Sequence, residues 1–151
     1  MVVEKEIIVR KASSKDATGI ISVLTSTSLG EEKCRTKTAF VTENLKDLGR
    51  VIVLVAEFNS SIIGFVDCIV FPSFWEGQKQ GLIADFFVRD KYQAQGVGSK
   101  LLEALVKWAE AQNVAELHVS TGWKNAKARK FYDKHGFTEE QLLLERCRGS
   151  E

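Results

Sequence analysis

The stretch 84–100, ADFFVRDKYQAQGVGSK, constrains the fold of this chain more than any other part of its sequence. It begins as an apolar run with aromatic and β-branched residues, which is typical of a buried strand. A polar turn and two glycines, Gly96 and Gly98, separate this run from apolar residues that recur at helical spacing. The first amides of a helix lack internal partners, and the helix dipole places positive charge beside them. The order strand, glycine-bearing loop and helix therefore predicts an anion-binding site.

Three phosphate-binding patterns can be compared with this loop. The P-loop pattern G-x-x-x-x-G-K-[ST] does not fit, because Gln93 stands where its first glycine would lie. The dinucleotide pattern G-x-G-x-x-G fails at its third glycine, where the chain has Leu101. The remaining pattern is Q-x-x-G-x-G, whose glycines lack a Cβ and would let a phosphate approach the backbone closely. A tight strand-to-helix turn that uses glycines only for its geometry would give the same residues.

A second patterned segment covers 125–137, NAKARKFYDKHGF. Asn125 can cap a helix that begins there, and Gly136 can end it in a left-handed conformation. Tyr132 follows Asn125 by seven residues, close to two full turns, so the two residues lie on nearly the same helix face. A capped amphipathic helix with Phe131 and Tyr132 as core aromatics would show the same pattern. The segment alone therefore leaves both interpretations open.

The composition indicates one ordinary globular domain spanning 1–151. Hydrophobic residues make up 44% of the chain and charged residues 27%, which is not typical of a disordered or membrane-embedded protein. The 21 basic and 20 acidic residues nearly cancel, so we expect no nucleic-acid partner. No apolar run approaches the roughly 20 residues of a membrane span, and the first residues lack a secretory pattern. We therefore expect a cytoplasmic protein that has no membrane partner.

Neither the cysteines nor the histidines show the spacing of a disulfide framework or a metal site. Cys34, Cys68 and Cys147 are odd in number and widely separated. His118 and His135 have no partner at the spacing of metal ligands. We therefore expect no metal.

The predicted elements follow an order that is typical of an α/β (mixed α+β) sheet. Strands are predicted at 6–11, 51–58, 62–71, 82–88, 115–121 and 137–145. Helices are predicted from a capping-box-like start at Ser13, Ser14 and Asp16, over about 38–48, from the glycine loop to about 113, and over 125–135. The order is thus β-α-α-β-β-β-α-β-α-β, with parallel pairing where helices connect strands. Many α/β or α+β domains share such an order, so it does not by itself predict a function.

The two patterned segments together resemble the signature motifs of the GNAT superfamily of N-acetyltransferases. Q-x-x-G-x-G resembles the cofactor motif of that family, and N-A-x-A-R-x-F-Y-x-K-x-G-F resembles its second signature. The resemblance extends over about 51–137, and ADFFVRDKYQAQGVGS is most similar to diamine (spermidine/spermine) N-acetyltransferases. It implies a GNAT-like fold, acetyl-CoA as cosubstrate and direct acetyl transfer to a primary amine of a small molecule.

The resemblance also implies how acetyl-CoA is held. The backbone of Phe86, Phe87 and Val88 would pair with the pantetheine arm as an added strand does. The pyrophosphate would be bound by the backbone amides of Gln93, Ala94, Gln95, Gly96, Val97, Gly98 and Ser99. Asn125 would contact the cofactor as well.

Catalytic roles follow from the same resemblance. Tyr132 would lie near the thioester sulfur, where a phenol with a pKa of about 10 can protonate the leaving thiolate. An amide near Val88 would polarise the thioester carbonyl. The similar diamine acetyltransferases typically carry a Glu base at the position of Ala84, which cannot accept a proton. Asp85 is the candidate base, directly or through water, although strand alternation points it to the opposite face unless a bulge re-aims it.

The acceptor and the assembly are less constrained. Carboxylates that could surround a cationic amine are Glu31, Glu32, Asp67, Glu76 and Asp85. The chain could instead be a non-catalytic acyl-CoA sensor, a protein N-terminal or lysine acetyltransferase, or an unrelated phosphate-binding domain. The run Leu142–Leu144 places apolar side chains on both faces of the predicted last strand, as a buried strand would. Because many members of the superfamily that the chain resembles form dimers, sometimes through this region, we expect a homodimer.

Overall fold

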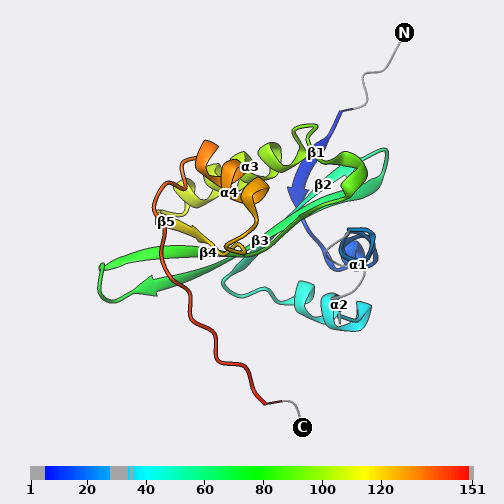
Figure 1. The fold of residues 1–151 in the computed structure, drawn as a ribbon. Coiled ribbons are helices and arrows are strands. Elements are labelled where there is room, and N and C mark those ends of the chain that lie inside the picture. Colours follow the sequence, from blue (N-terminus) through cyan, green and yellow to red (C-terminus); the bar gives the residue numbers. More distant parts are fainter. Residues whose placement is uncertain (1–5, 28–33, 35, 150–151) are drawn as a thin grey trace.

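A single five-stranded sheet forms the centre of the part of the chain that a computed structural model describes, residues 6–27, 34 and 36–149 (Figure 1). The strands are β1 (Ile8–Lys11), β2 (Val51–Phe58), β3 (Ser61–Ser73), β4 (Gln78–Val88) and β5 (Val114–Val119), in the spatial order β1-β2-β3-β4-β5. Neighbouring strands are antiparallel except β4 and β5, which are parallel because a helix connects them. The predicted α/β class with a mixed sheet is confirmed.

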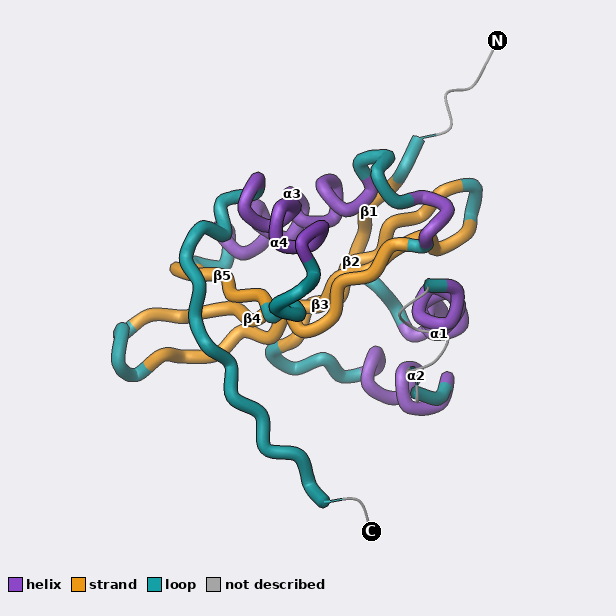
Figure 2. The backbone as a smooth tube through the Cα atoms, in the orientation of Figure 1, coloured by secondary structure: helices purple, strands orange, loops and turns teal. Residues whose placement is uncertain are grey.

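α-Helices cover both faces of this sheet, and the described residues form four of them. The helices α1 (Ala17–Ser26) and α2 (Thr38–Lys46) lie on one face, and α3 (Val97–Ala111) and α4 (Ala126–Lys134) lie on the other (Figures 1 and 2). Apolar side chains of the sheet therefore divide into two cores. One core packs against Val97, Leu101 and Leu105 of α3, and the other packs against α1.

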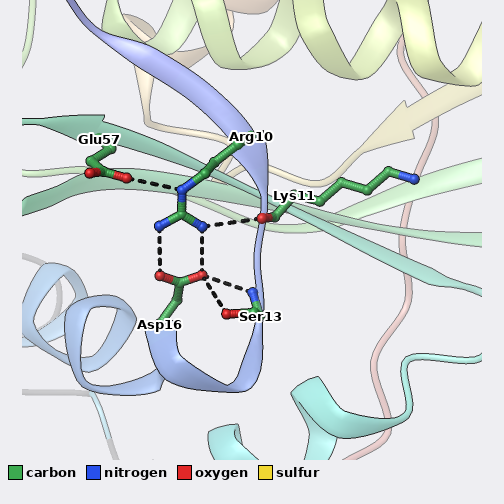
Figure 3. A network of polar contacts seen from close by, with 5 residues as sticks. All are labelled: Arg10, Lys11, Ser13, Asp16 and Glu57. Carbon is green, nitrogen blue, oxygen red and sulfur yellow. Dashed lines mark hydrogen bonds and ion pairs between the residues drawn. The ribbon is translucent and has the colours of Figure 1, made fainter. Parts of the chain in front are cut away.

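Polar contacts join the start of α1 to the sheet (Figure 3). Arg10 of β1 donates two hydrogen bonds of 2.8 Å to the carboxylate of Asp16, and its Nε donates to Glu57 of β2 over 2.9 Å. The backbone amide of Ser13 donates to the same Asp16 carboxylate over 2.8 Å. The hydrogen bonds from Arg10 lower the pKa of Asp16, so this side chain stays ionised at neutral pH. The predicted capping-box-like start is therefore confirmed.

The hairpin of β3 and β4 extends farther than the sequence predicts. The composition of 71–81 indicates a loop, but β3 continues to Ser73 and β4 already begins at Gln78. Ser73 and Gln78 face each other across the two strands, and the aromatic side chains Phe74 and Trp75 are exposed in the short turn between them. Cross-strand pairing thus overrides the local polar composition.

The strand predicted at 137–145 does not form. Residues 137–149 contain no strand, and after Phe137 the chain runs away from the sheet (Figure 1). Leu142, Leu143 and Leu144 are exposed along this segment. A strand needs a neighbour for its backbone hydrogen bonds, and none of the described strands pairs with these residues. This part of the prediction is wrong because an apolar run indicates burial without indicating what buries it.

Two other classes of feature are absent from the described ranges. None of their helices is both long and apolar enough to cross a membrane. Their His, Cys, Asp and Glu side chains form no group of three or more that could hold a metal ion.

Candidate active site

The first component of the candidate site is an open edge on β4. The parallel pairing of β4 with β5 ends at Ile83 and Val119, whereas β4 itself continues to Val88. Residues 84–88 therefore have β3 on one side and no paired strand on the other. An extended ligand can add to such an edge as a strand does.

The antiparallel pairing with β3 decides which residues of β4 serve this open edge. The backbone amide of Arg89 donates to the carbonyl oxygen of Ile63 in β3 over 2.9 Å. Backbone groups alternate in direction along an antiparallel ladder, so those of Phe87 also face β3. The backbone groups of Phe86 and Val88 then face the open edge. The backbone groups of Phe86 and the amide of Val88 are therefore available to a pantetheine arm, whereas the carbonyl oxygen of Val88 already accepts a hydrogen bond from the side chain of Gln93.

The second component is a run of unpaired backbone amides that follows β4 after a short 3₁₀ helix (Asp90–Tyr92). Among the described residues, none accepts a hydrogen bond from the amides of 94–99. Ala94 and Gly96 have positive φ angles of 58° and 85°, and Gly96 is the residue that caps α3. The last of these amides thus belong to the first turn of a helix of 15 residues. Unpaired amides at the positive end of a helix dipole suit a phosphate group.

The side chain of Gln93 holds this loop in place. Its Nε2 donates to the carbonyl oxygen of Val88 over 3.1 Å and to Asp90 over 3.0 Å. Its Oε1 accepts a hydrogen bond of 3.0 Å from Nζ of Lys127 in α4. Gln93 therefore connects the end of β4, the amide loop and α4, while Lys127 brings a positive charge to the loop.

Gly98 has a packing role in addition to the expected one. A Cβ at this position would lie 3.3 Å from Cζ of Phe131 and 3.6 Å from Cε1 of Phe86. The first turn of α3 therefore approaches α4 and β4 so closely that a larger residue would push them apart. The close approach of a phosphate is a second reason for glycine here, and it stays a prediction.

Tyr132 lies in an aromatic cluster beside the open edge of β4. Its ring centroid is 6.3 Å from that of Phe86, 5.4 Å from that of Phe131 and 5.6 Å from that of Phe137. Burial raises the pKa of Tyr132 to about 12, so the phenol is protonated at neutral pH. Within the described chain, no residue forms a hydrogen bond with its hydroxyl group. The hydroxyl is therefore available as a donor to a ligand.

Asn125 caps α4, as its position in the sequence predicts. Its Oδ1 accepts a hydrogen bond of 3.1 Å from the backbone amide of Ala128. This bond fixes the N-terminus of the helix that carries Tyr132. A contact of Asn125 with a cofactor stays a prediction.

A β-bulge interrupts the pairing of β3 and β4 beside the open edge. The paired positions on either side of it are Val66 with Phe86 and Cys68 with Ile83. Between them, one residue of β3, Asp67, lies opposite two residues of β4, Ala84 and Asp85. The extra residue changes the alternation, so Ala84 and Asp85 both line a cavity on the face covered by α1 and α2. The bulge that the sequence analysis required to re-aim Asp85 is therefore present.

This cavity, which we call the acceptor cavity, has a volume of about 600 Å³. Its walls are mostly apolar side chains from α1, α2 and the sheet, and its carboxylates are Asp47, Asp67 and Asp85. None of the described lining residues is a lysine or an arginine. Of the other acidic candidates, Glu76 lies in the turn between β3 and β4, away from the cavity, and Glu31 and Glu32 lie outside the described residues.

Arg89 is a supporting residue that belongs to neither of the two sequence motifs. Its Nη2 donates to the hydroxyl of Ser22 in α1 over 2.6 Å, and its Nε donates to the carbonyl oxygen of Ile62 over 3.0 Å. These bonds hold the end of β4 against α1 and the start of β3. The spacing of residues in the sequence does not reveal these contacts, because Arg89 and Ser22, like Lys127 and Gln93, are far apart in the chain.

These components fit an acyl-CoA. The amides of 94–99 match the negative charge of a pyrophosphate, and the backbone groups of Phe86 together with the amide of Val88 match an extended amide-bearing arm. Tyr132 and Asp85 flank the open segment of β4 from its two faces. The arrangement thus combines an anion site, a strand-like groove, a phenol donor and an acidic cavity.

Comparison with known proteins points in the same direction. The model of the acetyltransferase (GNAT) family matches residues 22–137. An uncharacterized N-acetyltransferase of Archaeoglobus fulgidus is 40% identical over 83 residues, which cover 53% of this chain and 55% of that protein. A spermine/spermidine N(1)-acetyltransferase of Bacillus subtilis is 30% identical over 83 residues, again 53% of this chain and 55% of that protein. The matched part of the chain thus spans about half the length of these relatives.

A solved structure shares the fold. An aminoglycoside N-acetyltransferase in complex with CoA superposes with a TM-score of 0.81 over 99% of both chains, at 15% sequence identity. At this identity the likeness concerns the fold alone.

Proposed function

Because the chain belongs to the acetyltransferase (GNAT) family, we propose that it transfers an acetyl group from acetyl-CoA to a primary amine of a small molecule. The observation that carries the proposal is the run of unpaired amides at 94–99 beside the open edge of β4. Polyamine-like acceptors are favoured by the acidic cavity and by the similarity to a spermine/spermidine acetyltransferase.

The proposed mechanism assigns a task to each part of the site. Acetyl-CoA, when bound, supplies the acetyl group as an activated thioester. The Val88 amide at the open edge would donate a hydrogen bond to the carbonyl oxygen, where negative charge develops during attack by the amine. Tyr132, protonated at neutral pH, would donate to the leaving sulfur. The acceptor cavity adjoins the open segment of β4, so an amine bound there would lie beside the thioester. The acetyl group would then pass directly to the amine, without a covalent enzyme intermediate.

A sensor that binds acyl-CoA without turnover is the second candidate. Ala84 favours it, since a methyl group cannot act as the base that the similar diamine acetyltransferases carry there. The available hydroxyl of Tyr132 opposes it, because a sensor needs no proton donor beside the thioester. The two candidates differ in whether free CoA is released.

We expect acetyl-CoA to stabilise the folded protein while NAD and ATP stabilise it much less. A ligand at 100 times its dissociation constant adds about 2.7 kcal/mol to the free energy of unfolding. Thermal unfolding with each compound measures this effect. Desulfo-CoA keeps the pyrophosphate and the arm, and it should stabilise the protein nearly as well. Equal or larger shifts with NAD or ATP would contradict the assignment of the loop at 94–99.

Release of free CoA from acetyl-CoA should accelerate when a suitable primary amine is added. A screen of polyamines, aminoglycosides, amino acids and peptides with free N-termini or lysines measures this rate. We expect the largest acceleration with polyamines, because the acceptor cavity contains carboxylates and no lysine or arginine among its described residues. Acceleration by peptides alone would indicate a protein acceptor. Tight acetyl-CoA binding without acceleration by any amine would favour the sensor.

The homodimer and the cytoplasmic location expected from the sequence stay predictions. The exposed run Leu142–Leu144 supports self-association, because contiguous exposed apolar side chains are typical of interaction surfaces. The same residues do not form the buried strand that was predicted within one chain.

A further inference from the structure

Asp67 is the residue of the acceptor cavity whose task the proposed mechanism leaves open. It lies on β3, opposite the bulge formed by Ala84 and Asp85. Its Oδ1 accepts a hydrogen bond of 3.0 Å from the backbone amide of Asp85. The bulge therefore does two things at once: it turns both residues of β4 into the cavity, and it fixes the Asp67 carboxylate beside them.

The surroundings of Asp67 favour its protonated form. Burial, and after it the negative charge of Asp85, raises the pKa of Asp67 to about 8. The other titratable groups that line the cavity are Asp47, just after α2, and Cys34. Cys68 follows Asp67 in the chain but belongs to the core on the α3 side, where burial raises the pKa of its thiol to about 11.

A cationic amine would complete this arrangement. The described lining residues offer no lysine or arginine to balance the carboxylates, so a bound ammonium group would supply the missing positive charge. Its charge would favour ionised Asp67, and a carboxylate that titrates near the working pH is suited to receive a proton. Asp67 thus offers, from the neighbouring strand, the carboxylate that Ala84 lacks.

We propose that Asp67 is the proton acceptor for the amine and that Asp85 binds the positive charge of the same amine. This inference rests on the proposed acetyl transfer and specifies its substrate as a cationic primary amine. The ammonium group gives one proton to Asp67 and becomes a neutral amine. Its nitrogen forms the bond to the acetyl carbon as the carbon–sulfur bond breaks. Tyr132 gives its proton to the departing sulfur, which becomes the thiol of CoA. The second proton lost by nitrogen restores the Tyr132 hydroxyl, and Asp67 releases its proton to solvent.

Kinetics of Asp67→Asn with spermidine as the probe test this assignment. We expect kcat/KM at pH 7 to fall at least 100-fold, and the loss to shrink at high pH, where free amine is abundant. Acetyl-CoA affinity, measured by calorimetry, should stay within threefold. Glu76→Gln is the matched control, because it removes one negative charge outside the cavity, and its kcat/KM should change less than threefold. The double variant Asp67→Asn with Ala84→Glu should recover part of the rate, since position 84 faces the same cavity.

A measurement without turnover tests the same arrangement. Because the pKa of Asp67 is raised in the folded state, the native protein binds more protons than the unfolded chain between about pH 4 and pH 8. Its stability should therefore fall as the pH rises through this range. Thermal unfolding of Asp67→Asn should lack this part of the pH dependence, so the two proteins should diverge in Tm as the pH increases.

Two results would overturn the assignment. One is an Asp67→Asn enzyme with kcat/KM within threefold of the wild type at pH 7. The other is a carbon-13 NMR titration of the wild-type protein in which the Asp67 carboxyl titrates near pH 4; this measurement decides even if the variant fails to fold. A failure of the proposed function would look different, because the wild type would then not bind acetyl-CoA or would release no CoA with any amine, and the role of Asp67 as a base would fall with it.

Discussion

Replacing Tyr132 by Phe should lower kcat by 10²–10⁴-fold, because general acid assistance to a leaving group is typically of this size. The loss corresponds to about 3–5 kcal/mol of barrier height. Phe keeps the ring contacts with Phe86, Phe131 and Phe137 and removes only the hydroxyl group. The affinity for acetyl-CoA should therefore stay within a few-fold, and the change should appear in kcat rather than in KM. Steady-state kinetics and calorimetry measure the two quantities separately.

The chain offers a matched control for this variant. Tyr92 is its other tyrosine, and its ring packs edge-on against Phe58 at a centroid distance of 5.8 Å. Tyr92→Phe removes a hydroxyl of the same kind without touching the aromatic cluster of Tyr132, so its kcat should stay near that of the wild type. A Tyr132→Phe enzyme with near-normal kcat would contradict the role as acid, and water would then be the proton source.

The parts of the fold that depend on local pattern could be predicted from the sequence. The strand over 51–58 has the predicted bounds, and the glycine loop leads from a strand directly into a helix, as the motif indicates. The cap at Asn125 is also present. Each of these features depends on a few residues that are neighbours in the sequence, so the residue types alone indicate the local structure.

The parts of the site that depend on strand register could not be predicted in the same way. The bulge that turns Asp85 into the cavity arises from the pairing of β4 with β3, and only the register of the two strands reveals it. Sequence alternation alone places Ala84 and Asp85 on opposite faces of the strand, and it indicates no role for Asp67. The hydrogen bond from Lys127 to Gln93 likewise joins residues that are 34 positions apart.

Gly98→Val should reduce both the stability of the fold and the affinity for acetyl-CoA. A Cβ at this position would already lie 3.3 Å from Phe131, and valine adds two further carbons. Overpacking of this kind typically costs about 1–3 kcal/mol. If the free protein relieves the strain by moving α3 and α4 apart, binding must restore the strained arrangement, so the affinity should fall by roughly 5–150-fold. Chemical denaturation and calorimetry measure the two effects.

A second substitution distinguishes the packing role of Gly98 from a direct role in phosphate binding. Phe131→Leu removes the ring atoms that a Cβ at 98 would meet, so adding it to Gly98→Val should restore stability. Affinity should recover together with stability if the glycine acts only by letting α3 and α4 approach. Restored stability with affinity still reduced would mean that the new side chain blocks the phosphate itself. Normal acetyl-CoA affinity in a destabilised Gly98→Val protein would show instead that the glycine serves the fold alone, and the cofactor would then depend on the other amides of 94–99.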